Sequence, residues 1–475
     1  MLRRTKIVAT LGPATDDEAA LSRLLSAGAN VVRLNFSHGS GDEHRARAER
    51  TRRAASDLDA SVGILGDLQG PKIRIESFAA GAVDLETGQA FALDADLDPE
   101  AGDAAGVGLG YRLLVDDVSV GDLLLLDDGA ITLEVTGVSG GRIDTRVENS
   151  GRLSSRKGLN LRGGGLSAAG LTEQDYRDIE LAAEMKVDFL AVSFVRSAAD
   201  IEEARARLRA AGGHARIVAK IERAEAVADL EAIIEASDVV MVARGDLAVE
   251  IGDPELPAVQ KRIIAQSREM NRTVITATQM MESMIEQPTP TRAEVLDVAN
   301  AVLDGTDAVM LSAETAVGAY AVNAVAAMGR ICVGAENGHF TPRSQRRLAT
   351  HFRRTDEAIA MATTYTARHM RADAIIALTD SGHTAMLMSR QDVGIPIYAL
   401  TRTAETCGYL TICRGVYPLA FEPADPAGPA LIREAVDFMV ARGDIAPGDR
   451  VLVTKGDMLG PGGTNTMKIV EVSGR

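Results

Sequence analysis

Charged side chains recur where short apolar runs of the sequence end. Lys220 and Glu222 close the run RIVAKIE, Asp246 closes VVMVARGD, and Arg33 lies inside VVRLNF. Because strand side chains repeat their direction every two residues, Lys220 and Glu222 would face the same side. Glu222 and Asp246 could then offer two carboxylates to Mg²⁺ or Mn²⁺, hard ions that also keep waters and accept substrate oxygens. Arg33, Arg74 and Lys220 would add the fixed positive charge that phosphoryl transfer needs.

Each of these residues also has a purely structural interpretation. Glu222 could form only an ion pair with Lys220 or Arg223 at a rim, and single arginines are usually solvated. An unpaired guanidinium inside VVRLNF would be costly, which favours a polar mouth or an anion beside Arg33. Two carboxylates and a lysine at neighbouring strand ends favour a site. In ARGDLAVE, Gly245 permits close approach of backbone N–H groups to an anion, with a plain tight turn as the alternative.

These residues need a scaffold that brings strand ends together. Eight apolar, β-branched runs alternate with helical patterns, and they start at Lys6, Val31, Val62, Phe189, Arg216, Val239, Thr273 and Ala308. Eight buried parallel strands, each followed by a helix, predict a closed (β/α)8 TIM barrel with all carboxyl strand ends at one mouth. An open doubly wound sheet uses the same alternation and stays an alternative. Further polar residues at the strand ends are Asn35, Ser37, His38, Asp67, Lys72, Arg74, Arg244, Thr278, Gln279 and Glu314.

The alternation of strand and helix stops once and then changes. Between Gly70 and about Leu166 only strand-like pieces and turns occur, which predicts a small β-barrel lid domain inserted after the third strand. The predicted division is therefore a TIM barrel at 1–70 and 166–337, a lid at 71–165, and a C-terminal α/β effector domain at 338–475. The last domain should contain the helix EAIAMATTYTARHM and strands in ADAIIALTDSG, PIYALT and DRVLVTKGD, after the linker NGHFTPRSQRRLATHFRR.

Composition limits the possible partners and the compartment. The 475 residues carry a formal net charge of -16, from 51 Lys and Arg against 67 Asp and Glu, which opposes binding to nucleic acid or to an anionic membrane. Three scattered cysteines, and no apolar run of membrane-spanning or signal-peptide length, predict a reducing cytoplasm. No GxxxxGK[ST] loop occurs, and the weak G-x-G-x-x-A match at Gly163, Gly165 and Ala168 is interpreted as a loop. The MMESM stretch is interpreted as packing.

Long stretches of the chain resemble the pyruvate kinase family, in order and over nearly the whole length. They include RTKIVATLGPAT, GANVVRLNFSHG, GDLQGPKIR, VAKIERAEAV, VMVARGDLAVEIG and ITATQMMESMIEQPTPTRAEVLDVANAVLDGTDAVMLSAET. The likeness is strongest to bacterial members whose third-strand loop reads DLQGPK. The resemblance implies an enzyme of glycolysis that transfers the phosphoryl group of phosphoenolpyruvate to ADP and forms pyruvate and ATP. It also implies dependence on Mg²⁺ or Mn²⁺.

The resemblance implies a role for each matching residue. Glu222 and Asp246 would hold the metal, Lys220 and Arg33 would face the phosphoryl group, and Thr278 would lie near the face where the enolate is protonated. The implied substrate-binding residues are Arg33, Lys220, Ala243, Arg244, Gly245, Asp246 and Thr278. The implied nucleotide-binding residues are Asn35, His38, Arg74 and Lys157.

The resemblance also extends to a monovalent-cation site, where this chain departs from the family pattern. The matching positions are Asn35, Ser37, Asp67 and Leu68. Potassium-dependent members resemble Thr, Lys and Glu where this chain has Leu68, Gln69 and Lys72. A lysine ammonium is a compact monocation, so Lys72 could replace the ion. The sequence therefore predicts activity without K⁺.

The C-terminal segment LTDSGHTA resembles the effector loop of the family. The residues concerned are Thr379, Asp380, Ser381, Gly382, His383 and Thr384. Asp380 and His383 stand where members activated by fructose bisphosphate often have lysine and arginine. A monophosphate sugar or a nucleotide is therefore the expected effector, with the glycine-rich stretch from Lys455 to Asn465 either closing over it or forming an ordinary turn. The resemblance also implies a homotetramer.

Two other functions fit parts of the pattern. A metal-dependent TIM-barrel aldolase or lyase acting on enolates would also need a metal, two carboxylates and a basic group. Arg74 and the inserted domain speak against it, because an aldolase need not hold a nucleotide. A non-catalytic sugar-phosphate sensor would not need Lys220, Glu222, Asp246 and Thr278 together.

Overall fold

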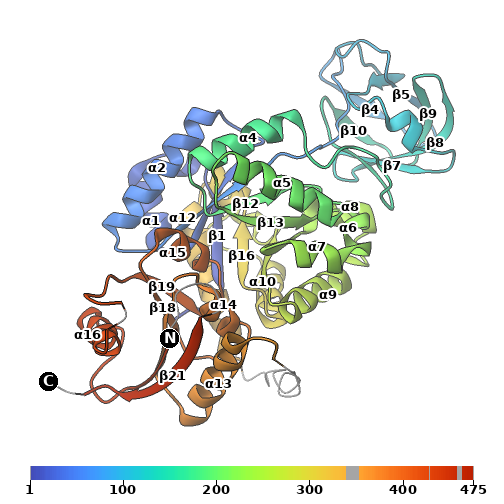
Figure 1. The fold of residues 1–475 in the computed structure, drawn as a ribbon. Coiled ribbons are helices and arrows are strands. Elements are labelled where there is room, and N and C mark those ends of the chain that lie inside the picture. Colours follow the sequence, from blue (N-terminus) through green and yellow to red (C-terminus); the bar gives the residue numbers. More distant parts are fainter. Residues whose placement is uncertain (1, 339–351, 427, 457–462, 474–475) are drawn as a thin grey trace.

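A closed barrel of eight parallel strands forms the centre of the molecule (Figure 1). The computed structural model describes residues 2–338, 352–426, 428–456 and 463–473. Around the barrel the order is β1, β2, β3, β12, β13, β14, β15, β16, and β16 pairs with β1 in parallel. This closure confirms the predicted (β/α)8 barrel and excludes the open sheet. The strands are β1 (Lys6–Thr10), β2 (Val31–Asn35), β3 (Gly63–Asp67), β12 (Phe189–Val192), β13 (Arg216–Ile221), β14 (Val239–Ala243), β15 (Thr273–Ala277) and β16 (Ala308–Leu311).

Alternation along each barrel strand separates two apolar cores. Ile7 and Ala9 of β1 pack in the core shared with the surrounding helices, whereas Val8 belongs to the core that includes Val218 and Met241. Successive strand residues point to opposite faces, so Val8 and its partners fill the barrel interior. Inward positions closer to the carboxyl ends hold polar residues instead. The interior is therefore apolar at its base and charged at its mouth.

Helices surround the barrel, and several begin at a capping box. Ser40 with Glu43, Thr172 with Asp175, and Thr291 with Glu294 each exchange the reciprocal hydrogen bonds that satisfy free N–H groups at a helix start. The barrel helices are α1 (Glu18–Ser26), α2 (Gly41–Asp57), α4 (Glu173–Glu184), α5 (Ala198–Ala210), α6 (Ala224–Ala228), α7 (Leu230–Ala236), α8 (Arg244–Ile251), α9 (Leu256–Glu269), α10 (Arg292–Asp304), α11 (Ala313–Ala316) and α12 (Ala321–Glu336), with 3-10 turns η1 (Pro13–Thr15) and η2 (Glu282–Ile285). None of the helices within the described ranges is long and apolar enough to cross a membrane.

The segment from Ala82 to Leu161, between β3 and α4, is called the insertion below and folds as a curled half-barrel. Its six-stranded sheet has the order β11, β7, β8, β9, β5, β6, and a separate pair joins β10 to β4. The predicted small β-barrel is thus an open, curled sheet. Its elements are β4 (Ala82–Leu85), β5 (Ala90–Asp94), β6 (Gly106–Gly108), α3 (Leu114–Asp117), β7 (Leu123–Leu126), β8 (Ile131–Ser139), β9 (Arg142–Val147), β10 (Gly151–Ser154) and β11 (Leu159–Leu161).

The C-terminal part is an α/β domain around a five-stranded sheet of order β19, β18, β17, β20, β21. The predicted helix and three predicted strands are present, and β19 and β21 were not predicted. Pro418 lies inside β19, and proline argues against a central strand, but β19 is an edge strand where it is tolerated. The elements are α13 (Thr355–Met370), β17 (Ala374–Leu378), α14 (His383–Ser389), β18 (Ile397–Thr401), α15 (Ala404–Leu410), β19 (Val416–Ala420), α16 (Leu431–Arg442), β20 (Arg450–Gly456) and β21 (Thr464–Glu471).

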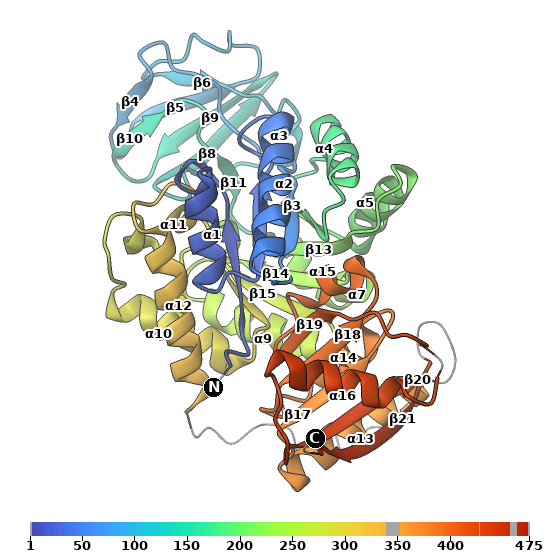
Figure 2. The ribbon, with the colours of Figure 1, turned by 90° about the vertical axis from the view of Figure 1, so that its left-hand side faces the viewer.

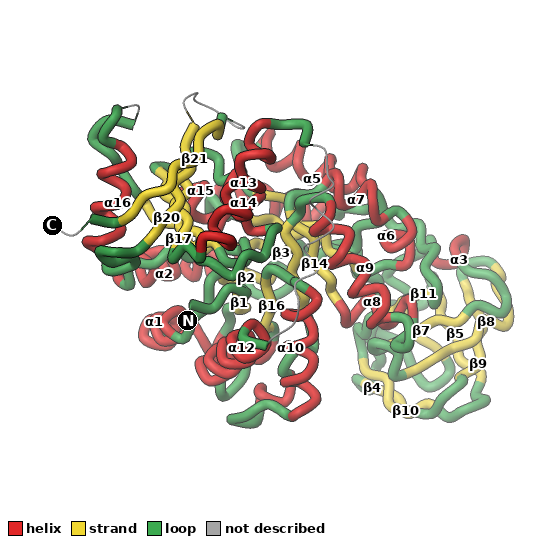
Figure 3. The backbone as a smooth tube through the Cα atoms, turned by 90° about the horizontal axis from the view of Figure 1, so that it is seen from below, coloured by secondary structure: helices red, strands yellow, loops and turns green. Residues whose placement is uncertain are grey.

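The insertion and the C-terminal domain lie at opposite ends of the molecule, with the barrel between them (Figures 2 and 3). Most of the predicted linker, and residues 457–462 of the predicted effector-closing stretch, lie outside the described residues. The domain division at residues 70, 165 and 337 stays a prediction.

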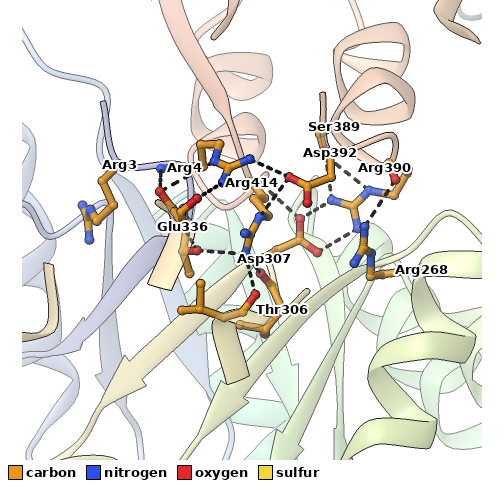
Figure 4. Close-up of polar contacts among 12 residues, drawn as sticks. Arg3, Arg4, Arg268, Thr306, Asp307, Glu336, Ser389, Arg390, Asp392 and Arg414 are labelled. Carbon is orange, nitrogen blue, oxygen red and sulfur yellow. Dashed lines mark hydrogen bonds and ion pairs between the residues drawn. The ribbon is translucent and has the colours of Figure 1, made fainter. Parts of the chain in front are cut away.

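A network of buried ion pairs joins the C-terminal domain to the base of the barrel (Figure 4). The Asp307 carboxylate, just before β16, accepts hydrogen bonds from both Nη atoms of Arg390, at 2.7 Å from Nη1. It also accepts from the backbone N–H of Val274 at 2.9 Å and of Arg414 at 3.1 Å. Both side chains of the Asp307–Arg390 pair are 1% exposed. Arg4 extends the network, because its Nη1 lies 2.9 Å from Asp392 Oδ1.

Candidate active site

Four charged side chains meet at the barrel mouth. The Lys220 ammonium lies 3.0 Å from Glu222 Oε1 and 3.3 Å from Asp67 Oδ1. Arg33 Nε donates to Asp67 Oδ2 at 2.6 Å, and Arg33 Nη1 donates to Thr10 Oγ1 at 3.1 Å. These residues continue the inward alternation of β1, β2, β3 and β13 beyond the apolar layer. Arg33 is therefore neither unpaired nor dependent on an external anion, because Asp67 is its partner.

The mouth is strongly coupled electrostatically. Burial alone would raise the pKa of Asp67, but the charges of Lys220 and Arg33 hold it below its ordinary value. Burial would lower the pKa of Lys220, but Asp67 and Glu222 raise it. The pKa of Glu222 is raised, first by burial and then by the negative charge of Asp246, which outweigh Lys220. Lys220 is consequently kept protonated, while Glu222 and Asp246 repel each other.

Asp246 begins the other half of the mouth, in the first turn of α8. Its Oδ1 lies 3.0 Å from the Lys72 ammonium, which comes from the chain leading into the insertion. Two like charges close enough to raise the pKa of Glu222 are an arrangement that a divalent cation relieves. Within the described ranges, no cluster of three or more His, Cys, Asp or Glu side chains could hold a metal. Two carboxylates can supply only part of the ligands of a hard ion of the Mg²⁺ type, which accepts waters and substrate oxygens as the rest.

Thr278 and the start of α8 form the third side of the mouth. Thr278 and Gln279 have φ of 67° and 52°, a strained conformation for residues with a side chain. Thr278 Oγ1 accepts from the Gly245 N–H at 2.8 Å, and Arg244 Nη2 donates to the Thr278 carbonyl at 2.6 Å. Arg244 also pairs with Asp297 at 2.7 Å. The Arg244 guanidinium thus supports the strained loop at Thr278. The predicted turn at Gly245 is the first turn of α8.

Asn35 is the last residue of β2, and Ser37 and His38 follow in a tight turn beside the same mouth. The Ser37 N–H donates to Asn35 Oδ1 at 3.2 Å, and the His38 N–H donates to the Asn35 carbonyl at 3.2 Å. Register pairs Asn35 with Asp67, so this turn adjoins the Asp67 end of the cluster. Arg74 and Lys157 lie together at the edge of the insertion, because Arg74 pairs with Gly158 in an antiparallel bridge. Lys157 forms an ion pair with Asp127 at 2.7 Å.

Ser193 belongs to the mouth, and the sequence reasoning missed it. Its hydroxyl lies 2.7 Å from the Lys220 ammonium and donates to the Leu68 carbonyl at 2.7 Å. Phe194, which has φ of 56°, donates its N–H to Glu222 Oε2 at 2.8 Å. The signal was present in the sequence, since Ser193 is the polar residue that follows the fourth barrel strand, as Asp67 ends the third.

The predicted effector residues border a cavity of about 100 Å³ in the C-terminal domain. Of the six, Thr379, Asp380, Ser381 and Thr384 line it, together with Arg402 and Lys455 among others. His383 instead lies 3.6 Å from the Asp356 carboxylate, and burial lowers the pKa of its imidazole. The loop thus contributes three hydroxyl-bearing residues and one acidic residue to the wall of the cavity.

A barrel with a charged mouth, two carboxylates and a buried lysine suits the class of enzymes that stabilise negative charge on a substrate, which includes phosphotransferases and enolate-forming lyases. Comparison with known proteins specifies it further. The family model described as "Pyruvate kinase, barrel domain" matches residues 2–325, and "Pyruvate kinase, alpha/beta domain" matches residues 357–470. Pyruvate kinase II of Salmonella typhimurium is 54% identical over 99% of both chains. Pyruvate kinases of Haemophilus influenzae and Geobacillus stearothermophilus are 53% and 42% identical, over 98% and 100% of this chain and 97% and 81% of theirs.

The chain belongs to the pyruvate kinase family. Its activity is accordingly that of a pyruvate kinase, a kinase of glycolysis, and the family uses a divalent metal. This assignment decides against the aldolase and the non-catalytic sensor.

Proposed function

We propose that phosphoryl transfer from phosphoenolpyruvate to ADP takes place at the mouth built by Arg33, Lys220, Glu222, Asp246 and Thr278. The observation that carries this proposal is the Lys220 ammonium, held between Asp67 and Glu222 at 3.3 Å and 3.0 Å. It is a protonated lysine beside a pair of mutually repelling carboxylates, at the place where strand ends of the barrel converge.

In the proposed mechanism, Glu222 and Asp246 hold Mg²⁺ or Mn²⁺. When bound, the ion supplies Lewis-acid stabilisation of the substrate carboxylate and of the enolate oxygen. Lys220 and Arg33 stabilise the transferring phosphoryl group as its bond to the enol oxygen breaks and a bond to a terminal phosphate oxygen of ADP forms. The enolate carbon then takes a proton, with Thr278 orienting a water on that face. Formation of pyruvate pulls the transfer forward.

The remaining substrate contacts come from the surroundings of this centre. The backbone from Ala243 through Arg244 and Gly245 to Asp246 binds the carboxylate of phosphoenolpyruvate, since the N–H groups of a helix start favour anions. Asn35, His38, Arg74 and Lys157 bind the nucleotide. The bridge between Arg74 and Gly158 brings Arg74 close to Lys157, which supports a shared role of the two residues toward the nucleotide.

A pyruvate-formation assay with phosphoenolpyruvate, ADP and Mg²⁺ tests the proposal. Lys220→Met should lower kcat by about 10²-fold to 10³-fold, because the variant loses an interaction made mainly in the transition state. Glu222→Ala should also abolish most turnover. Lys261→Met is a matched control, since the Lys261 side chain is 58% exposed on α9 and forms an ion pair with Asp304. Equal activity of Lys220→Met and Lys261→Met would refute the assigned role.

We propose further that the enzyme does not require K⁺. Both oxygens of Asp67, one of the positions assigned to the monovalent cation, already face Arg33 and Lys220. Lys72 adds an ammonium at Asp246. Activity in tetramethylammonium buffer should match that in K⁺, and Lys72→Glu should create a requirement for K⁺, with Lys72→Gln as the charge-neutral control. Loss of wild-type activity without K⁺ would contradict the proposal.

We also infer that the cavity beside Thr379, Ser381 and Thr384 takes a sugar monophosphate or a nucleotide. Its hydroxyls suit phosphate oxygens, while the carboxylate of Asp380 disfavours a second phosphate. Titrating candidates against the phosphoenolpyruvate saturation curve, for wild type and Ser381→Asp, tests this. A curve unaffected by every candidate would remove the effector. A homotetramer, a cytoplasmic location and the domain division at 1–70, 71–165, 166–337 and 338–475 are further proposals, the first open to analytical ultracentrifugation.

A further inference from the structure

Glu250 is a buried acid that the proposed mechanism does not use. It lies on α8, four residues after Asp246, so the two carboxylates share one helix face a turn apart. The side chain of Glu250 is 2% exposed, and burial raises its pKa to about 7. A carboxyl group kept in such surroundings needs partners, because burying a polar group without them is costly.

The partners of Glu250 come from three parts of the chain. Its Oε2 accepts from the Ala224 N–H at 2.9 Å, two residues after Glu222. Its Oε1 accepts from Asn160 Nδ2 at 3.4 Å, on β11 of the insertion. Its own carbonyl accepts from the Gly163 N–H at 3.0 Å, on the connection that returns from the insertion to the barrel. Figure 3 shows α8 beside β11 at this junction.

The connection that returns from the insertion is built around this junction. Gly163, Gly164 and Gly165 have φ of 89°, 82° and 104°, a conformation open to glycine at little cost. The Gly165 N–H donates to Glu225 Oε1 at 2.5 Å. The connection that leads into the insertion carries Lys72, whose ammonium forms an ion pair with Asp246. Both connections therefore contact α8. Lys72 contacts Asp246 in its first turn, and Gly163 contacts Glu250 one turn later.

We propose that Glu250 is a positioning residue that links the insertion to the two metal-binding carboxylates. Through Ala224 it fixes the segment that carries Glu222, through α8 it fixes Asp246, and through Asn160 and Gly163 it ties both to the insertion. Groups that orient metal ligands typically affect metal affinity or activity by about 10-fold to 100-fold. The inference rests on the proposed role of Glu222 and Asp246 in metal binding.

Binding of Mn²⁺ to the enzyme without substrates, followed by the electron paramagnetic resonance of the free ion, tests this link. Glu250→Ala should weaken binding about 10-fold or more. Glu250→Gln keeps an acceptor for the Ala224 N–H and should stay within about threefold of wild type. Asn160→Ala removes the contact from the insertion and should weaken binding severalfold, but it should have no further effect when added to Glu250→Ala, because the two residues act as one unit.

Asn149→Ala is the matched control. Asn149 is another asparagine of the insertion. It accepts from the Thr132 N–H and donates to the Ala130 carbonyl, and both of these residues belong to the insertion. Wild-type Mn²⁺ binding by both Glu250→Ala and Asn160→Ala would overturn the inference, as would equal effects of Asn160→Ala and Asn149→Ala. Glu222→Gln in the same titration distinguishes a failure of the proposed metal site from a failure of the role of Glu250. If it leaves binding unchanged, the proposed metal site is wrong; if it abolishes binding while Glu250→Ala binds Mn²⁺ as tightly as wild type, only the role of Glu250 is wrong.

Discussion

Removal of one partner of the buried Asp307–Arg390 ion pair should lower the free energy of unfolding by several kcal/mol. Asp307→Asn keeps the shape of the side chain but removes the charge that faces both Nη atoms of Arg390. The Arg390 guanidinium, 1% exposed, would then lie in the protein without a counter-charge at that position. Breaking one side of a buried ion pair typically costs about 3–5 kcal/mol. We expect a loss of this size in the free energy of unfolding.

Urea-induced unfolding followed by circular dichroism measures this loss. Arg45 and Glu184 provide the matched control. Arg45 also donates two hydrogen bonds to one carboxylate, from Nε at 2.9 Å and from Nη2 at 2.7 Å. The side chains of Arg45 and Glu184 are, however, 40% and 59% exposed. Arg45→Met should cost no more than about 1 kcal/mol.

A double-mutant cycle then separates the pair from its surroundings. Arg390→Met combined with Asp307→Asn should be less destabilised than the sum of the two single variants, since the second change removes the charge that the first leaves unpaired. Strictly additive losses, or a loss for Asp307→Asn no larger than for Arg45→Met, would refute the reasoning.

Three further predictions concern the same end of the barrel. Burial raises the pKa of Asp188 from 3.8 to about 6, so the free energy of unfolding should fall by up to about 3 kcal/mol as the pH rises between these values. Asp188→Asn should remove this loss. Equal dependence of the unfolding free energy on pH in wild type and Asp188→Asn would contradict this. Gly408→Ala should lower the unfolding free energy by about 1–3 kcal/mol, because a Cβ there would lie 1.8 Å from Asp188 Oδ1. Burial raises the pKa of Cys332 to about 12 and of Cys413 to about 11, so neither thiol should react with iodoacetamide at neutral pH until the protein unfolds; mass spectrometry of the labelled native enzyme checks this.

The sequence was sufficient for the barrel and for most of the residues at its mouth. Each barrel strand is a short apolar run, and the polar residue that ends it marks the mouth, so strand and site were predicted from the same local pattern. Lys220 and Glu222 were placed on one side by simple alternation, and their ammonium and carboxylate are 3.0 Å apart.

Contacts between distant segments were beyond this reasoning. The pairing of Arg33 with Asp67 depends on the register of β2 against β3, which no local pattern specifies. The same holds for Glu250, whose partners come from other parts of the chain. β19 was missed for a different reason, because Pro418 reads as a strand breaker unless the strand is known to lie at an edge.

The apolar base of the barrel has a consequence for how the enzyme could be divided. Val8, Leu65 and Met241 from inside the barrel form one continuous core with Ile375 and Leu410 of the C-terminal domain. The C-terminal domain thus covers apolar side chains at the base of the barrel, and a fragment ending near residue 337 would expose them to water. Removal of the C-terminal domain by truncation is therefore expected to yield aggregates, and a soluble barrel fragment would need a redesigned base.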